Sequence, residues 1–572
     1  MSARLRTELW IKIKRCLETT KLPESLNTAL RSLNLRLDNP TGEFLFSLPV
    51  KTKDYDIRNA AENLVGIVKP DDFFSGIAIR REKHSENLLF FLNREQCIKD
   101  IVESEPHSVG ITDEDYSSHK KILVEYSSPN IAKPFHVGHL RSTILGNYIA
   151  NINDYLCNDV KRINYLGDWG TQFGFIQLGI DSLNISDEQM RQDPIRILYK
   201  AYVHANKLGE TDPSISETAR KIFNELESGV GGELEKWETF RRYTVDELTK
   251  TYKRLGINFH EYNWESNYKA KDISEIISRM ESQEILKTDR EGRRVIALSE
   301  ERSIPIMKSD GSTLYITRDI AAAVDRFDKY KFDNMYYVVD NAQTDHFVTL
   351  SQILDKMGFP WSNKIKHIKF GRIRGMSTRK GSAIFLKDIM DETQVVMKEK
   401  QIKSPNTKVE LDCGSETTDI LGISAIIIND LKQRRLRDYV FDWDKALDVK
   451  GDTGVKLQYV HCRLTSLEEN SGAKLPEKCD PSVLNEPIIG QLVLEIGKFD
   501  EAILRSHQEF EPCILVNYLF SLSHTINKGL KILRVKGEPT DIGSQRLLVF
   551  HAARNILAQG MKLLGLQPLN KM

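Results

Sequence analysis

The spacing of hydrophobic residues divides the chain into three regions. Over residues 1–118, stretches with helical periodicity such as "DIRNAAENLVGIV" alternate with short apolar runs such as "EFLFSLPV" and "NLLFFLN". Alternation of these two patterns predicts a small α+β domain. The polar stretch "ITDEDYSSHK" follows and predicts a linker, which places the first boundary near residue 118.

From Lys120 the pattern becomes strand, helix, strand. "KILVEYS" is an apolar strand run, and "SPNIAKP" is a loop because its two prolines bar a helix. "HVGHLRSTILGNYIANINDYLC" has the periodicity of a helix, and "VKRINYLGDWG" is a strand that ends in a Gly-rich turn. A helix that connects two such strands predicts a Rossmann-like, doubly wound α/β domain with a parallel sheet over residues 119–431.

A helical, highly charged stretch at about residues 185–290 predicts an insertion in this α/β domain. The sheet pattern is expected to resume at "SIPIMKSDGSTLYITRDIAAAVDRFDKY", where "SDGS" predicts a tight hairpin turn and "RDIAAAVDRF" opens a helix. Further strands are expected in "NMYYVVDNAQ" and "KIKHIKFGRIRGMSTRKGSAIFL". From residue 432 the chain is almost purely helical, which predicts an all-α bundle over residues 432–572.

Composition narrows the class of protein. The 572 residues are 40% hydrophobic and 28% charged, as in ordinary globular proteins, and no apolar run approaches the roughly 20 residues of a membrane helix. The formal net charge is +0, so a nucleic-acid surface would have to be a local basic patch. The seven cysteines are scattered and never form a CxxC pair, which argues for a reducing compartment and against a structural zinc site.

The first residues differ from the rest. The stretch "MSARLRTELWIKIKRC" carries five basic residues against one acid and alternates apolar with basic positions. Such a pattern is typical of an organelle transit peptide, and equally of an amphipathic first helix of the mature fold. Both interpretations stay open from this stretch alone.

The first candidate for chemistry is the pair His136 and His139 in "PFHVGH". At the start of a helix, side chains three apart share one face, beside unpaired backbone N–H groups and a partial positive charge. Imidazole N–H donors there suit a nucleotide's phosphates, and Gly138 allows close approach of the ligand. The alternative is a pair of helix-cap histidines with no ligand. A zinc site would need a third ligand, and the HExxH pattern is absent, so we expect no bound metal.

The second candidate is the loop "GRIRGMSTRKGSAIF". Small residues alternate there with the cations Arg379 and Lys380, so the loop could close over a triphosphate and hold the departing pyrophosphate. The alternative is a solvated basic turn.

Acidic residues form the third candidate. Glu125 ends a strand beside the histidine loop, and Asp319 lies four residues after Tyr315 in "LYITRDI". Two carboxylates with a tyrosine are what a guanidinium ligand would need, because they offer bidentate hydrogen bonds and a stacking face. The alternative for each acid is a structural ion pair or a helix cap.

These motifs resemble, in order and spacing, those of the arginyl-tRNA synthetases of class I. The resemblance rests on "VEYSSPNIAKPFHVGHLRSTILGN", "INYLGDWGTQFG", "SDGSTLYITRDIAAA", "GMSTRKG" and "DYVFDWDKALDVKGDTGVKLQYVHCRL". It covers about residues 120–572, whereas residues 1–118 match only in position and size, where the family has an extra domain that touches the tRNA. The resemblance implies ligation of L-arginine to the 3′ adenosine of tRNA(Arg), with ATP and Mg²⁺, through an arginyl-adenylate.

The resemblance also implies four sets of site residues. Catalytic roles fall to Lys133, His136, His139, Arg379 and Lys380. ATP binding falls to Asn130, Lys133, His136, Gly138, His139, Gly375, Met376 and Ser377. Arginine binding falls to Glu125, Asn130, Tyr315, Asp319 and Gln343. Contact with the tRNA anticodon falls to Gln458, Tyr459 and Met572.

One motif departs from the class pattern. Class I enzymes usually carry KMSKS as their second signature, and here Gly375 and Thr378 stand at its two lysine positions. The family implies that Lys133, just before the first signature, supplies the missing charge. How the charge divides between Lys133, Arg379 and Lys380 stays open.

Rival interpretations are a class I synthetase for glutamine or glutamate, a small HxGH nucleotidylyltransferase, and a non-catalytic tRNA-binding paralogue. Asp319 and the helical C-terminal region argue against the first two, and the intact motifs argue against the third. We expect a monomer in the mitochondrial matrix, with the cytoplasm as the alternative location.

Overall fold

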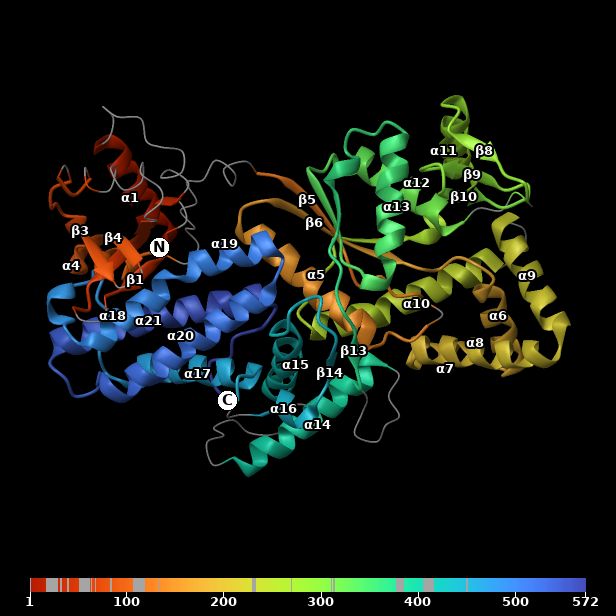
Figure 1. Cartoon of the computed structure of the whole chain (residues 1–572). Coiled ribbons are helices and arrows are strands. Elements are labelled where there is room, and N and C mark those ends of the chain that lie inside the picture. Colours follow the sequence, from red (N-terminus) through yellow and green to blue (C-terminus); the bar gives the residue numbers. More distant parts are fainter. Residues whose placement is uncertain are drawn as a thin grey trace. The chain divides into compact units, whose positions relative to one another are not determined.

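The computed structural model of the chain describes two compact units (Figure 1). The central unit comprises His119–Val396 and Gln433–Trp443, and the terminal unit comprises Met1–Ser118, Met397–Lys432 and Asp444–Met572. The described residues are 2–16, 29–30, 33–38, 41–50, 62, 64–66, 68–82, 85–105, 119–131, 133–228, 233–268, 270–309, 311, 314–376, 385–404, 416–448 and 451–572.

A parallel sheet forms the centre of the central unit. Its order is β12-β11-β5-β6-β7, so the chain enters in the middle at β5 and winds outwards first on one side and then on the other. The strands are β5 (Lys121–Glu125), β6 (Asp159–Leu166), β7 (Glu261–Trp264), β11 (Asn334–Tyr337) and β12 (Ile365–His367). The chain leaves β5 and its neighbour β11 in opposite directions, and ligands of such sheets bind where this happens. The Rossmann-like prediction is confirmed.

Helices cover this sheet through apolar contacts. Buried Leu123 of β5 and Ile163 of β6 belong to one core cluster with residues of α11 (Ala270–Ser282), α12 (Tyr315–Tyr330) and α13 (Thr344–Lys356). Helix α5 (Val137–Tyr155) lies against β5 and β6. Gly146 allows this approach, because a Cβ there would come within 2.2 Å of the Tyr126 ring.

The inserted segments differ from the prediction in two respects. The stretch from 185 to 290 contains β7, which is a strand of the main sheet, so the helical insertion ends before it. The run "SIPIM" forms β10 (Ser303–Met307), which pairs in a separate antiparallel sheet instead of resuming the main one. Its partners are β9 (Arg294–Ala297) and β8 (Leu286–Thr288).

The expected hairpin at "SDGS" is also wrong. Helix α12 begins at Tyr315, directly after its N-cap residue Leu314, so the described chain after the turn continues as a helix and not as a strand; Asp310, Ser312 and Thr313 lie outside the described residues. The inserted helices are α6 (Gln172–Ser182), α7 (Asp187–Gln192), α8 (Pro194–Thr211), α9 (Pro213–Ser228) and α10 (Glu233–Arg254).

The terminal unit begins with an α+β domain. Its antiparallel sheet has the order β1-β2-β4-β3. The strands are β1 (Leu35–Leu37), β2 (Phe44–Val50), β3 (Phe74–Glu82) and β4 (Ser85–Leu92), with helix α4 (Arg94–Val102) after them. The first helix, α1 (Ser2–Cys16), buries Leu5, Leu9 and Ile13 at a four-residue spacing. The expected amphipathic first helix is therefore confirmed, and import by this segment stays a prediction.

The described residues in the rest of the terminal unit are mostly helical, which confirms the all-α prediction for the C-terminal region; this unit also includes residues 397–432, which were predicted as part of the α/β domain. Polar and apolar positions alternate at helical spacing, and Pro487 and Pro512 occupy first turns, where proline loses no intrahelical bond. Its helices are α15 (Glu416–Leu431), α17 (Gly454–Asn470), α18 (Pro487–Gly497), α19 (Phe499–Glu509), α20 (Pro512–Ile532) and α21 (Thr540–Leu563). Among the described helices of the whole chain, none is long and apolar enough to cross a membrane.

Candidate functional site

The loop after β5 opens with two strained serines. Ser127 and Ser128 have φ angles of 76° and 47°, in the left-handed region that costs a non-glycine residue about 1 kcal/mol or more. Hydrogen bonds hold them there: the Ser127 N–H donates to Ser142 Oγ at 2.9 Å, and the Ser128 N–H donates to Asn164 Oδ1 at 3.0 Å. The turn directs the chain across the carboxyl ends of the strands.

Asn130 and Lys133 occupy the middle of this loop. Asn130 pairs with Gly167 at the end of β6, where a Cβ on residue 167 would lie 2.9 Å from Asn130 Nδ2. Gly167 therefore makes room for the amide of Asn130. Lys133 is exposed three residues before the first histidine.

The histidine pair forms a reciprocal cap at the start of α5. His136 is the N-cap residue; its Nδ1 accepts from the Gly138 N–H at 3.0 Å, and its own N–H donates to His139 Nδ1 at 3.3 Å. The two ring centroids are 4.2 Å apart. Because each Nδ1 accepts a backbone proton, the neutral ring carries its own proton on Nε2. A Cβ on Gly138 would lie 2.8 Å from His136 Cε1, so a side chain here would displace the ring that forms the cap.

Both histidines are held neutral. Burial lowers the pKa of His139 to about 3, and the charges of His136 and Lys133 add to this effect. Burial, with the charge of Lys133, also lowers the pKa of His136. The pair therefore presents two Nε2–H donors near neutral pH. In the described part of the chain, no three His, Cys, Asp or Glu side chains are grouped as metal ligands would be.

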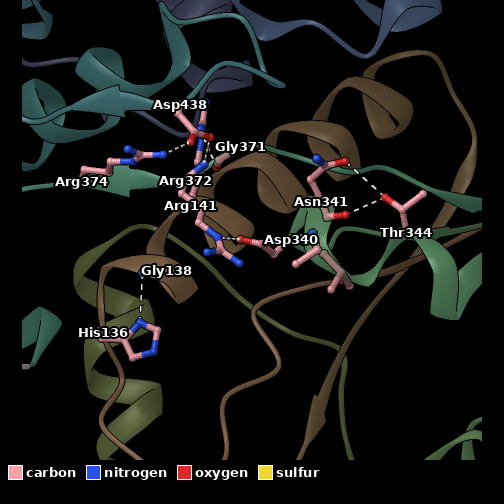
Figure 2. A network of polar contacts seen from close by, with 12 residues as sticks. His136, Gly138, Arg141, Asp340, Asn341, Thr344, Gly371, Arg372, Arg374 and Asp438 are labelled. Atoms are coloured by element: carbon pink, nitrogen blue, oxygen red, sulfur yellow. Dashed lines mark hydrogen bonds and ion pairs between the residues drawn. The ribbon is translucent and has the colours of Figure 1, made fainter.

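A buried arginine connects this helix to the second signature. Arg141 is 1% exposed, and its Nη1 donates to the carbonyls of Gly371 at 2.6 Å and Arg437 at 2.9 Å. Figure 2 labels Arg141 and Gly371. These partners lie 230 and 296 residues further along the chain. Arg141 thus ties the histidine helix to the segments that flank the loop of the second signature. Sequence reasoning missed it, although a charged residue inside an apolar helix face was a usable signal.

The base of that loop is a short parallel strand pair. β13 (Ile373–Arg374) pairs with β14 (Tyr439–Val440), and Asp438 clamps it by accepting from the Arg372 N–H at 2.7 Å and from Arg374 Nη2 at 2.8 Å (Figure 2). Gly375 follows with a φ of 69°, a conformation that favours glycine.

Only part of the predicted loop can be placed. Met376 is buried after Gly375. The predicted residues Ser377, Arg379 and Lys380 lie outside the described residues.

The two predicted acids lie in different surroundings. Glu125 is 4% exposed, and its Oε2 lies 2.5 Å from Nη1 of buried Arg326. Arg326 also lies over the Tyr165 ring at 4.8 Å and donates to the Tyr337 hydroxyl at 3.2 Å. The ion-pair alternative therefore holds for Glu125, whose cation is an internal one.

Asp319 lies on α12, one turn after Tyr315. Its carboxylate is 28% exposed and its Oδ2 lies 2.7 Å from Nε2 of His346 on α13. Tyr315 is 71% exposed, and Gln343 is exposed at the end of the short helix η2 (Asn341–Gln343). Burial and the charge of Asp319 raise the pKa of Glu125, while Arg326 lowers it, so the two acids share one corner of the unit.

A further buried carboxylate, Asp168, joins the ends of β6 and β7. It accepts from the N–H and the hydroxyl of Ser266 at 3.0 and 2.7 Å, and Arg241 lies 3.5 Å away. Burial raises the pKa of Asp168 to about 6, although these hydrogen bonds oppose it. The contacts give it a structural part in holding the strand ends.

In the terminal unit, the predicted tRNA residues separate into two kinds. Gln458 is fully buried; its Nε2 donates to Ser424 Oγ and the Gln567 carbonyl, and its Oε1 accepts from the Leu569 N–H. Its side chain therefore holds the C-terminal tail, and a direct contact of Gln458 with tRNA stays a prediction.

Tyr459 and Met572, by contrast, line a pocket of about 620 Å³. Tyr459 is 40% exposed. The other lining residues are Cys462, Arg463, Ser466, Leu467, Glu469, Asn470, Ser471, Leu530, Lys536, Asn570 and Lys571.

Comparison with known proteins agrees with this geometry. Residues 107–443 match the family described as tRNA synthetases class I (R), catalytic domain, and residues 457–572 match the DALR anticodon binding domain. The chain is 39% identical over 565 residues to a probable mitochondrial arginine–tRNA ligase of Homo sapiens, covering 96% of both chains. It is 38% identical over 478 residues to the cytoplasmic arginine–tRNA ligase of Saccharomyces cerevisiae, covering 80% of this chain and 78% of that one.

The fold is also that of a solved structure. The structure of Thermus thermophilus arginyl-tRNA synthetase superposes with a TM-score of 0.79 at 21% identity, over 99% of this chain and 100% of that one.

Proposed function

The chain belongs to the arginyl-tRNA synthetase family, and from this premise we propose which residues carry each step of its reaction. The protein is an arginine–tRNA ligase: it joins L-arginine to ATP as arginyl-adenylate, releases pyrophosphate, and transfers the arginyl group to the 3′ adenosine of tRNA(Arg). The observation that carries the choice of arginine is Asp319, a partly exposed carboxylate one helical turn from exposed Tyr315.

We assign the phosphate side of the site to the start of α5. When the arginine carboxylate attacks the α-phosphate, negative charge grows on the phosphate oxygens. The Nε2–H groups of His136 and His139 donate to that charge while remaining neutral, and exposed Lys133 supplies the fixed positive charge. Mg²⁺ bound with ATP would neutralise part of the triphosphate charge.

The loop of the second signature supplies the remaining cations in this proposal. Arg379 and Lys380 close over the β- and γ-phosphates, and the strand pair β13–β14 fixes the start of the loop. Arg141 bonds to the carbonyls of Gly371 and Arg437, next to β13 and β14, so it joins the histidine helix to the base of the loop.

We assign the substrate guanidinium to Asp319, with Tyr315 against its face and Asn130 and Gln343 towards the amino and carboxylate groups. We give Glu125 a supporting role beside Asp319, because its charge is already neutralised by Arg326. A planar guanidinium can use two acceptors at once, whereas a lysine ammonium would leave one unpaired and lose orders of magnitude in specificity. No editing step is then required.

Pyrophosphate exchange, measured with arginine and tRNA present, tests this assignment. Asp319→Asn should raise the KM for arginine by roughly 100-fold, because a charge-assisted pair contributes about 1.5–3 kcal/mol. The KM for ATP should change by less than about twofold. Asp328→Asn, an exposed acid of the same helix that pairs with Lys331, is the matched control.

Three outcomes would contradict the proposal. Equal losses for arginine and ATP would remove Asp319 from the amino acid pocket. If glutamine or glutamate supported pyrophosphate exchange as well as arginine does, arginine would not be the specific substrate. Binding of tRNA without any exchange would indicate a non-catalytic paralogue.

For tRNA, we propose that the anticodon meets the pocket of Tyr459 and Met572, and that Gln458 acts by holding the tail that forms one wall. Tyr459→Ala should raise the KM for tRNA about tenfold, as expected for loss of one stacked base. Leu475→Ala, an exposed apolar residue of the same unit, should not. An unchanged KM for tRNA in Tyr459→Ala would exclude this pocket.

We propose the mitochondrial matrix as the location, on the basis of the human relative and the basic α1; the yeast relative is cytoplasmic. A fusion of residues 1–30 to a fluorescent protein tests import, and a diffuse cytosolic signal would count against it. We propose a monomer, which light scattering of the purified chain would test.

A further inference from the structure

Glu125 and Asp319, the two acids assigned to the arginine site, each pair with a basic side chain of the protein, but these two partners differ in kind. Glu125 faces Arg326, whose guanidinium is charged at every accessible pH, and both side chains are almost completely buried. Asp319 faces His346, whose imidazole can lose its charge, and about a quarter of each side chain is exposed. Only the second pair can release its acid to a ligand without leaving an unpaired buried cation.

We propose that His346 is a positioning residue of the arginine site: its imidazolium neutralises Asp319 while the site is empty, and it gives up one proton when the substrate guanidinium binds. This inference rests on the proposed assignment of the guanidinium to Asp319. It adds a proton-coupled step to amino acid binding, so that affinity for arginine depends on pH although arginine's own side chain does not titrate.

The exchange balances in protons and charge. In the empty site, His346 donates Nε2–H to Oδ2 of Asp319 and carries a second proton on Nδ1. When the guanidinium approaches, the Nδ1 proton leaves to solvent, which reaches the 26% exposed side chain. The Nε2–H bond to Oδ2 stays, and Oδ1 accepts from the guanidinium. The carboxylate is paired with one positive charge before and after, and one proton is released for each arginine bound.

The surroundings favour the charged imidazole in the empty site. The hydrogen bond to Asp319 raises the pKa of His346; burial opposes this, and the charge of Asp345 adds to it. Asp345 itself pairs with Arg302 at 2.8 Å. As pH falls below the raised pKa, more sites hold an imidazolium that the substrate must discharge, so arginine binding weakens by up to tenfold per pH unit.

Other charged groups face this corner from every element packed against it. They are Arg318 and Arg326 on α12, Glu125 on β5, Tyr165 on β6, Glu265 on η1 (Glu265–Asn267) and Tyr337 on β11. Burial raises the pKa values of both tyrosines, so they stay neutral. Arginine side chains stay charged. Burial raises the pKa of Glu265 to about 7, against the effect of Arg318, so this acid is the rival source of pH dependence.

Charging kinetics of the full chain between pH 6 and pH 8 separate the two sources. In the wild type, kcat/KM for arginine should rise with pH, by up to about tenfold per pH unit below the raised pKa of His346, while kcat/KM for ATP should rise much less. His346→Gln keeps a donor near Oδ2 without a charge, so its arginine profile should be flat within about twofold. A wild-type slope retained in His346→Gln would overturn the proposal and point to Glu265.

His367→Gln is the matched control. Burial lowers the pKa of His367, and its Nε2 pairs with the Val339 carbonyl, so this histidine is already neutral. The variant should keep the wild-type profile. A flat profile in His367→Gln would show that any histidine substitution nearby removes the effect, and would also overturn the proposal.

Calorimetry of the wild type gives a readout that needs no variant. Arginine titrated into the tRNA-bound enzyme at pH 6, in two buffers of different ionisation enthalpy, should release close to one proton per arginine bound. Heat that does not depend on the buffer overturns the inference while leaving the arginine site intact. No arginine heat and no charging at any pH would instead reject the proposed function.

Discussion

Two regions of the central unit place histidines after the carboxyl ends of the inner strands β5 and β11, and they hold these histidines in opposite charge states. At the start of α5, His136 and His139 accept backbone protons on Nδ1, and partial burial together with the charge of Lys133 lowers both pKa values, so they are neutral. At the corner of α12 and α13, His346 meets a carboxylate and is favoured as a cation. The residue type is the same, and its partners decide whether it is a neutral donor, as we propose for the phosphates, or a charged counter-ion.

Of the predicted changes, removing one neutral histidine of the α5 pair should have the largest effect on catalysis. His139→Ala should lower kcat for pyrophosphate exchange by about 100- to 1000-fold, the usual result of deleting one donor to a charge that grows in the transition state. The KM for arginine should stay within about threefold, because the proposed role of this ring is at the phosphates and not at the guanidinium. A comparable rise in the KM for arginine would show that His139 also acts on the amino acid, and would contradict the separation of the two regions by role.

The opposite charge states should also appear as opposite effects of pH on stability. His139 has a lowered pKa, so its contribution is present above pH 6.5 and is lost as pH falls towards 3, by about 2–3 kcal/mol at pH 4.5. His346 has a raised pKa, so its contribution is present below pH 6.5 and is lost as pH rises through that raised value.

Thermal unfolding of His139→Gln and His346→Gln against the wild type, from pH 4.5 to 8.5, measures both. Relative to the wild type, the first variant should gain stability in acid, and the second should lose most in acid. Parallel curves for the two variants would show that their surroundings do not set different charge states.

The smallest expected effect tests how the cap positions the ring of His136 in the neutral histidine pair. In Gly138→Ala, the new methyl would crowd the His136 ring at 2.8 Å and displace it from its cap. We expect kcat to fall about tenfold, by roughly 1.4 kcal/mol, with no change in the KM for arginine. Gly66→Ala, where a Cβ meets nothing within 4 Å, is the control. Full activity in Gly138→Ala would mean that the cap does not fix the ring.

The sequence predicted local features of the fold well. The run "KILVEYS", the proline-containing loop and the helical period of "HVGHLRST" predicted β5, its loop and α5, because each depends on neighbouring residues only. Strand pairing between distant segments was harder. "SIPIM" has the pattern of a main-sheet strand, yet it pairs with β9, since an apolar run does not say which partner it will find.

The site shows the same limit. The positions of Glu125, His136 and Asp319 at strand and helix ends followed from motifs, but their partners did not. Arg326 lies 201 positions after Glu125 (326 − 125), and His346 lies on another helix from Asp319, so no local pattern joins them. Gln458 looked available in sequence, and only the return of the tail at Leu569 buries it.

The reach of Arg141 has a consequence for synthesis on the ribosome. Its carbonyl partners at Gly371 and Arg437 do not exist when α5 emerges, so the guanidinium must stay hydrated while nearly 300 further residues are translated. The nascent α5 can form as a helix, but it cannot seat against the sheet with that side chain buried until residue 437 has left the exit tunnel. The residues of the first signature are therefore translated early, but their packing is completed only after residue 437 has been translated. A truncated chain that ends before Arg437 should keep its histidine helix loosely attached.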